Sequence, residues 1–321
     1  MPIPHVIRVI GASDDENPEE SQAGHAPGAR TRGTHAGPGS RASTTPAGLC
    51  PAPPGVGHNR GMDLGLSGRT FLLTGASRGL GLAAAKALAG EGAHVILCAR
   101  DERKLTDAVA AVGPESAVGL PADLADPDTA ERVVAGTIAR FGRLDGALIS
   151  VGGPAPGTPM TVTDDEWRAG FESVHLGAVR MMRAVASAAT VEPAAPLGTG
   201  PAMLAVLSTS AKSPIHGLST SNGLRPGLAM LVKDFADELG PRGIRVNGIL
   251  PGRIATDRTL ALDASQGNAA AARRRNEAAI PLGRYGDPAE FGRLAAFLLS
   301  PAASYITGSL IPVDGGSLRA L

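Results

Sequence analysis

The sequence predicts an α/β fold in which helices cover both faces of a doubly wound parallel sheet. Two observations predict it. Short apolar runs alternate with helix-length segments from residue 70 to residue 313, and this alternation is typical of βαβ units with parallel strands. The string TGASRGLG at residues 74–81 lies between the first run and the first helical segment. A glycine turn at that place is typical of Rossmann-like, nucleotide-binding sheets.

The elements follow in order along the chain. The first strand is TFLLT, and an alanine-rich helix follows the glycine turn. In the helix from about Asn222 to Leu239, apolar residues form one stripe, and Pro226 is expected in its first turn, where a missing N–H costs little. The predicted strands are residues 70–74, 94–99, 117–120, 146–151, 202–207, 244–249 and 309–313. The predicted helices are residues 82–89, 127–141, 164–189, 222–239 and 288–299, and residues 254–279 are expected to form a loop over the substrate.

The first 61 residues differ in composition from the rest. They hold 10 Gly and 9 Pro, with small or polar residues between them. Such a segment buries too little apolar surface to offset its conformational entropy. We therefore expect residues 1–61 to be a disordered extension and residues 62–321 to form a single domain. A second interpretation, in which Met62 is the natural start, gives the same boundary.

The composition argues against several classes of function. With 30 basic and 30 acidic side chains, the chain has no excess charge to attract a nucleic acid or an acidic membrane. One Trp, two Tyr and six Phe make a base-stacking surface improbable. Two cysteines form no disulfide framework and no metal cluster. No apolar run approaches the length of a membrane span. We expect a cytoplasmic protein without a metal, a nucleic-acid partner or a membrane anchor.

Further strings accompany the glycine turn and give the chain a family resemblance. They are DL at residues 123–124, ISVG at 149–152, IRVNGILPG at 244–252, PLGRYGDPAE at 281–290, ITG at 306–308 and VDGG at 313–316. With them the chain resembles the short-chain dehydrogenase/reductase family from about residue 63 to residue 316, and most of all its 3-oxoacyl-acyl-carrier-protein reductases. The resemblance implies NAD(P)H-dependent reduction of a carbonyl or oxidation of an alcohol, a small-molecule substrate, and assembly as a homodimer or homotetramer.

Charge at the end of the second strand bears on the choice of cofactor. An acidic residue there would bind the ribose hydroxyls and repel a 2′-phosphate, but this chain has Ala99 followed by Arg100, and Arg78 lies in the glycine turn. NADP(H) is therefore expected. Alternatively, Arg100 is only the solvated start of a helix, and Asp123 does not bind the cofactor but only caps a turn. The expected cofactor-binding residues are Gly75, Ser77, Arg78, Gly79, Leu80, Gly81, Arg100, Asp123, Leu124, Gly152, Arg225, Pro251 and Gly252.

The expected active site departs from the family pattern of Asn, Ser, Tyr and Lys. Ser221 and Arg225 stand at the Tyr and Lys positions, and Ser208 stands at the Ser position. The Asn position is Val174 or His175, depending on the count. A serine hydroxyl is too weak an acid to replace an activated phenol, and an arginine with a pKa above about 12 rarely donates a proton. Ser208, Ser221 and Arg225 are the candidate catalytic residues, although each serine has an alternative role as a cap.

Three other side chains are candidates for the missing acid or for holding a water. Lys212 and His216 follow the Ser208 strand at the carboxyl end of the sheet, and His175 lies at or beside the lost Asn. The alternative for Lys212 and His216 is a solvated loop, and for His175 a buried helix position.

Three functional hypotheses remain open. The first is an NADP(H)-dependent oxidoreductase that acts on a carbonyl, an alcohol or an activated alkene of a small-molecule or acyl substrate. The second is a non-redox isomerase or lyase on the same fold. The third is an inactive nucleotide-binding or scaffold subunit.

Overall fold

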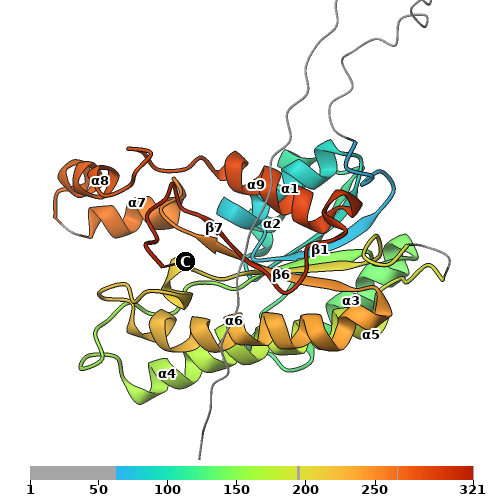
Figure 1. Ribbon diagram of the computed structural model, residues 1–321, viewed down its shortest axis with the longest axis horizontal. Helices are drawn as coiled ribbons and strands as arrows, with labels where there is room; N and C mark the ends of the chain where they lie inside the picture. The colour runs from blue at the N-terminus through green and yellow to red at the C-terminus, as the bar shows by residue number, and fades with distance from the viewer. Residues whose placement is uncertain (1–62, 194–195, 266, 321) are drawn as a thin grey trace, which may run out of the picture. The chain divides into compact units, whose positions relative to one another are not determined.

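The computed structural model describes residues 63–193, 196–265 and 267–320. Within these residues seven strands form one sheet in the order β3-β2-β1-β4-β5-β6-β7, and every neighbouring pair is parallel (Figure 1). Helices lie on both faces of this sheet, so the predicted fold class is confirmed. The extension expected at residues 1–61 lies outside the described residues.

The strands are β1 (Thr70–Thr74), β2 (His94–Ala99), β3 (Ala117–Pro121), β4 (Gly146–Ser150), β5 (Ala202–Val206), β6 (Arg245–Pro251) and β7 (Leu310–Val313). The helices are α1 (Gly79–Gly90), α2 (Glu102–Val112), α3 (Thr129–Phe141), α4 (Asp164–Gly170), α5 (Gly177–Ala188), α6 (Ser219–Leu239), α7 (Asp257–Ala264), α8 (Ala269–Ala278) and α9 (Pro288–Leu299).

The winding of the sheet fixes where a ligand binds. From β1 the chain moves outward to β2 and β3, then returns to place β4 on the other side of β1. Leu72 of β1 thus pairs with Ile96 of β2 and with Ala147 of β4. All strands end at the same edge, and the direction of winding reverses between β1 and β4. Open α/β sheets bind their ligands at the carboxyl edge near such a reversal.

Alternate residues of each strand enter two separate cores. Leu72 belongs to a buried cluster with side chains of α3, α5 and α6, such as Val232. Phe71 and Leu73 belong to a second cluster with side chains of α1, α2 and α9, such as Phe291. Figure 1 shows these two helical layers above and below the sheet. A strand buried on both faces is expected to be mostly apolar, and β1 is buried at all five positions, with apolar side chains at the three central ones.

Three helices were missing from the sequence prediction. α2 connects β2 to β3, and α7 and α8 occupy the segment that was expected to be a loop. Local capping explains each start. Asp101, Thr256 and Asn268 accept backbone N–H groups in the first turns of α2, α7 and α8, respectively. The capping residues stand in the sequence, but α8 is mostly Ala and Arg and has no apolar stripe to predict a helix.

Two predicted helices differ in detail. The predicted helix 164–189 is interrupted by a π-helical turn, Phe171–Leu176, between α4 and α5. α6 begins at Ser219 rather than near Asn222, so the placement of Pro226 in a first turn was wrong: it lies inside the helix. Pro226 lacks the N–H that would bond to the Asn222 carbonyl. The early start has a local cause, since the Asn222 side chain holds the preceding loop by hydrogen bonds to both backbone groups of Ile215, each 2.9 Å long.

A buried arginine joins the sheet to the segments around α9. Arg245 begins β6 and is 2% exposed. Its guanidinium donates to the carbonyls of Gly198, Leu298 and Ser300, each at 2.8 Å, and of Ile306 at 3.3 Å. Burial lowers its pKa to about 10, with a smaller effect of the Arg69 charge. The positive charge of Arg245 is thus stabilised by backbone carbonyls, two of them at the end of α9, rather than by a carboxylate.

In the described part of the chain, no helix is long and apolar enough to cross a bilayer.

Candidate functional site

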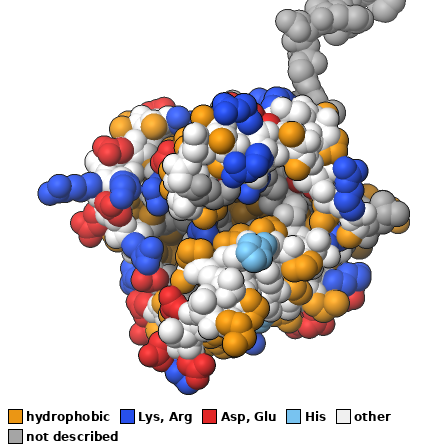
Figure 2. Space-filling view, turned by 90° about the vertical axis from the view of Figure 1, so that its left-hand side faces the viewer, with side chains coloured by type: hydrophobic (Ala, Val, Ile, Leu, Met, Phe, Trp, Pro, Cys, Tyr) orange, Lys and Arg blue, Asp and Glu red, His pale blue; other side chains and the backbone are white. Residues whose placement is uncertain are grey.

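A cleft of about 580 Å³ opens at the carboxyl edge of the sheet. Its walls come from the glycine turn after β1, the loop after β4, the end of β5 with the start of α6, and the loop after β6 with α7 and α8. Figure 2 shows this end of the molecule, with a hollow whose rim carries apolar side chains. The cleft therefore lies where the reversal of the winding predicts a ligand site.

The glycine turn has no room for side chains at Gly75 and Gly81. Gly75 has a φ of +60°, and a Cβ on it would lie 2.7 Å from the Ser150 carbonyl oxygen. A Cβ on Gly81 would lie 2.5 Å from the Gly75 carbonyl oxygen. No side chain caps the N-terminus of α1, and its first turn holds no acidic residue. The N–H groups at this helix end are therefore available to an anion such as a pyrophosphate.

The other expected cofactor residues divide into two groups. Leu80, Gly152, Pro251 and Gly252 line the cleft together with Arg78, whose side chain is 63% exposed and lies 4.0 Å from Asp257. The remaining four lie outside the lining: Ser77, Arg100, Asp123 and Leu124. Arg100 is exposed just before α2, and Asp123 accepts a hydrogen bond from the Ala125 N–H. These contacts match the alternatives of a helix start and a turn cap, although Arg100 follows β2, which adjoins β1, and Asp123 follows β3, the next strand outward.

Three serines come together at the end of β5. Ser208 follows the strand, lines the cleft, and accepts a hydrogen bond of 3.1 Å from the Ser210 N–H. The Ser221 side chain also lines the cleft, and its Oγ lies 3.0 Å from the Ser210 Oγ. Ser210 is buried and was not singled out from the sequence, because only the fold brings it beside Ser221.

Arg225 lies one helical turn after Ser221 and is 5% exposed. One Nη donates to the Val206 carbonyl, while its Nε is buried without a partner. Burial lowers the pKa of Arg225 to about 10, and the positive charge of Arg258 contributes further. Arg225 thus remains a cation at neutral pH, next to the two cleft serines.

Both candidates for the lost Asn position lie in one π-helical turn. A π-helical turn accommodates one more residue than an α-helical turn, and this one spans Val174 and His175. Val174 is buried in the core. His175 stacks on Phe171, with ring centroids 5.3 Å apart, and its Cε1 lies 3.3 Å from where a Cβ on Gly227 would be. Neither lines the cleft, so His175 is not placed to hold a water there.

Lys212 and His216 are exposed and do not line the cleft. Their loop instead contributes Ile215 and Leu218, which form part of an apolar wall. Among the residues that the structure describes, no group of three or more His, Cys, Asp or Glu side chains is arranged to hold a metal.

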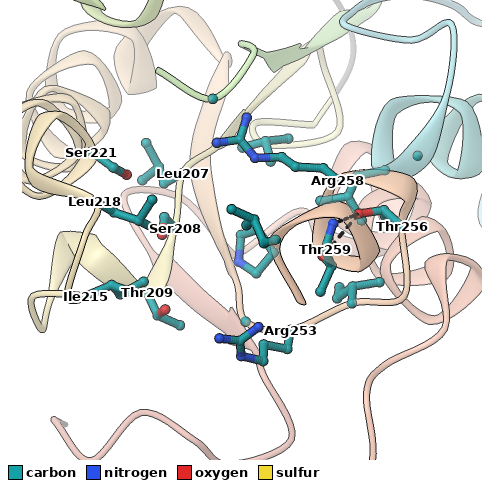
Figure 3. Close-up of a pocket in the computed structure, with 18 of the residues that line it drawn as sticks. Leu207, Ser208, Thr209, Ile215, Leu218, Ser221, Arg253, Thr256, Arg258 and Thr259 are labelled. Carbon is teal, nitrogen blue, oxygen red and sulfur yellow. Dashed lines mark hydrogen bonds between the residues drawn. The ribbon is translucent and has the colours of Figure 1, made fainter. Parts of the chain in front are cut away.

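Two arginines of the cleft were not foreseen from the sequence. Arg253 follows β6, and Arg258 lies in the first turn of α7. Figure 3 shows Arg258 reaching from α7 across the cleft toward the wall that carries Leu207 and Ser221. Arg258 lies in the segment 254–279, which was predicted as a loop without recognisable pocket residues, and Arg253 immediately precedes that segment.

A buried carboxylate holds α7 and α8 in place over the cleft. Asp263 of α7 is 1% exposed and accepts hydrogen bonds from Tyr285 Oη at 2.8 Å, Asn276 Nδ2 at 3.0 Å and Arg253 Nη1 at 3.2 Å. These partners come from α8, from the loop before α9 and from the loop after β6. The two cover helices are thus anchored to the sheet through one side chain.

We expect Asp263→Asn to loosen this cover. The amide loses one acceptor and the ion pair with Arg253, so local opening becomes easier. Hydrogen exchange over residues 257–278 should speed up by about 10-fold, while exchange in β5 stays unchanged. Asp257→Asn, an exposed change on the same helix, is the control. Equal exchange in the two variants would contradict the anchoring role.

Comparison with known proteins adds independent information. The family model described as enoyl-(acyl carrier protein) reductase matches residues 75–317. The chain is 34% identical to L-rhamnose 1-dehydrogenase (NAD(P)(+)) of Azotobacter vinelandii, over 77% of this chain and 96% of that protein. It is 30% identical to 3-oxoacyl-acyl-carrier-protein reductase of Vibrio cholerae, over 79% and 98%. The structure of L-sorbose reductase from Gluconobacter frateurii with NADPH and L-sorbose is similar, with a TM-score of 0.73 and 30% identity, over 81% and 100%.

Proposed function

The chain belongs to the short-chain dehydrogenase/reductase family, and from this premise we propose that it is an NADP(H)-dependent oxidoreductase acting on a carbonyl, an alcohol or an activated alkene. The observation that carries the proposal is the continuity of one cleft. The glycine turn, with the uncapped end of α1, opens into the same space as Ser208, Ser221 and Arg225. A dinucleotide seated on the turn therefore places its reactive end near these three side chains.

The residues present fit NADP(H). Gly75, Gly79 and Gly81 allow the backbone to approach a pyrophosphate, and Arg78 supplies a cation at the turn, where a 2′-phosphate is expected. The relatives support this choice, because one is named for NAD(P)(+) and another is described with NADPH. When bound, the cofactor supplies or accepts the hydride.

Each candidate side chain has a distinct role in this proposal. Ser208 accepts from the Ser210 N–H, so its own O–H is left to donate to the substrate oxygen. Arg225 stabilises negative charge on that oxygen, because it is a buried cation beside the serines. The hydrogen bond between the Ser221 and Ser210 hydroxyls connects the cleft to the protein interior.

Carbonyl reduction requires a proton donor, and position 221 does not supply a strong one. No phenol stands at position 221, and a serine hydroxyl is a poor general acid. Water entering the open cleft is the remaining proton source. Reduction of an activated alkene fits this arrangement, since the hydride goes to the β-carbon and water then protonates the α-carbon.

Two measurements test the function. Titration of the full chain with NADPH, followed by cofactor fluorescence, gives affinity before any substrate is known. NADPH oxidation against matched ketones and enones then identifies the reaction. Tight NADPH binding with oxidation by one class is the expected result. Tight binding without oxidation by any compound would favour a scaffold role, and absence of binding would favour non-redox chemistry.

A charge change at the turn tests the cofactor choice. We expect Arg78→Ala to weaken NADPH binding by about 10- to 100-fold, because a hydrogen bond to a charged phosphate is lost. NADH affinity should change by less than about 3-fold, since NADH has no 2′-phosphate. Arg100→Ala reports the contribution of the second cation, and exposed Arg103→Ala is the control. Equal losses for the two cofactors in Arg78→Ala would contradict this role.

A further inference from the structure

The charges that line the cleft do not balance. Its described lining includes Arg78, Arg225, Arg253 and Arg258 but one acidic residue, Asp257. Asp257 lies 4.0 Å from Arg78, and Arg253 forms an ion pair of 3.2 Å with Asp263. Over the described ranges, neither Arg225 nor Arg258 forms an ion pair with a carboxylate. Two guanidinium groups therefore bring uncompensated charge to the catalytic end of the cleft.

The Arg258 guanidinium lies against Gly153 in the loop after β4. It occupies the space that a Cβ on Gly153 would fill. From there it points toward the wall of Leu207 and Ser221 (Figure 3). This contact requires glycine at position 153. Arg258 thus lies on the side of the cleft that carries Ser208 and Ser221, while the glycine turn and Arg78 line the part where the phosphates of a dinucleotide are expected.

This placement has an electrostatic cost in the protein alone. The positive charge of Arg258 lowers the pKa of Arg225. Partial burial in the cleft lowers the pKa of Arg258, and Arg78 lowers it further. Like charges held close together near apolar walls destabilise each other. An anion bound at Arg258 relieves this repulsion and accepts hydrogen bonds from its guanidinium group, while the buried charge of Arg225 attracts the same anion.

The rest of the cleft is suited to an apolar group. Ile215, Leu218 and Ile280 contribute side chains to its walls, and none of them is charged or polar. An arginine beside an apolar wall fits an amphipathic molecule, whose head is anionic and whose body is hydrophobic.

We infer that the substrate carries a carboxylate close to its reacting carbon and an apolar body, and that Arg258 is the specificity-determining residue that binds the carboxylate. This inference rests on the proposed function and narrows it to oxo, hydroxy or enoic acids. Arg225 contributes from behind through its buried charge. The pyrophosphate of the cofactor is the competing anion for Arg258, and the experiment separates the two.

The test uses a pair of ligands that differ in charge and undergo no reaction. Calorimetric titration of the full chain, saturated with NADP⁺, compares 4-phenylbutanoate with neutral 4-phenylbutanamide. We expect the acid to bind about 10- to 100-fold more tightly than the amide. Arg258→Met should abolish this preference, and Arg258→Lys should retain part of it. Arg274→Met removes an exposed charge from α8 and is the control that keeps the full preference.

The outcomes are distinguishable. Equal affinity for acid and amide in a protein that binds NADPH would overturn this inference alone. So would an acid preference that survives Arg258→Met. If Arg258→Met weakens NADPH binding as much as acid binding, the arginine serves the cofactor phosphates and the inference is overturned. Absence of NADPH binding in the unaltered protein would overturn the proposed function and this inference with it.

Discussion

Replacing Ser221 by Tyr and Arg225 by Lys in one protein is expected to raise kcat for ketone reduction by about 100-fold or more. A positioned general acid contributes about 10²- to 10⁴-fold, and position 221 lacks one. Ser221 lines the cleft, and its Oγ contacts Ser210. A tyrosine ring there enters the cleft on the side of Ser208. The lysine ammonium then lowers the pKa of the phenol, so that its proton is transferred more readily.

The double change is expected to exceed Ser221→Tyr alone. The hydrogen bond to the Val206 carbonyl fixes Arg225 in place. Its guanidinium group also extends farther from the backbone than the ammonium group of a lysine at this position would. Steady-state NADPH oxidation with a ketone panel measures the gain. Ser221→Phe with Arg225→Lys is the matched control, since it adds the ring without the hydroxyl. Equal rates in these two double variants would show that the reacting carbonyl does not lie near residue 221.

Arg245→Met is expected to lower the free energy of unfolding by about 3–5 kcal/mol. Four carbonyls lose their donor, and each buried acceptor left unpaired costs about 1–3 kcal/mol, with part recovered by relaxation. Methionine keeps most of the buried length, so cavity formation adds little. Urea unfolding at 25 °C measures the change from the midpoint and slope.

Arg242→Met provides the comparison for this variant. Arg242 is exposed and donates one hydrogen bond of 2.7 Å, to the Ala186 carbonyl. Its loss is expected to cost less than about 1 kcal/mol. A loss for Arg245→Met as small as that would mean that the four carbonyls find other donors.

The sequence predicts the sheet better than the helices that cover the cleft. All seven strands were found, because each is an apolar run bounded by turn residues, as TFLLT in β1 is. α7 and α8 were missed because their helical form depends on the caps Thr256 and Asn268 and on the anchor at Asp263. Tertiary contacts of this kind leave no periodic trace in the sequence.

The residues of the candidate site also fall into those that the sequence predicts and those that it does not. The glycine turn is a local feature, so its residues could be listed from the string TGASRGLG. Arg258 reaches the cleft and Ser210 reaches Ser221 through tertiary structure, and no spacing rule points to either residue. Val174 and His175 both lie in the π-helical turn and neither lines the cleft, so neither count places a cleft residue at the Asn position.

The order of the strands also constrains how the chain folds as it is synthesised. β1 can pair with β2 once residue 99 has left the ribosome, but its other edge waits for β4 at residues 146–150. Until then a central strand, whose side chains are all buried in the complete sheet, has an unpaired edge, which is the kind of edge that invites association between chains. β7 is the last of the seven strands in chain order and pairs with β6, so this pairing becomes possible only after the other six strands have been synthesised.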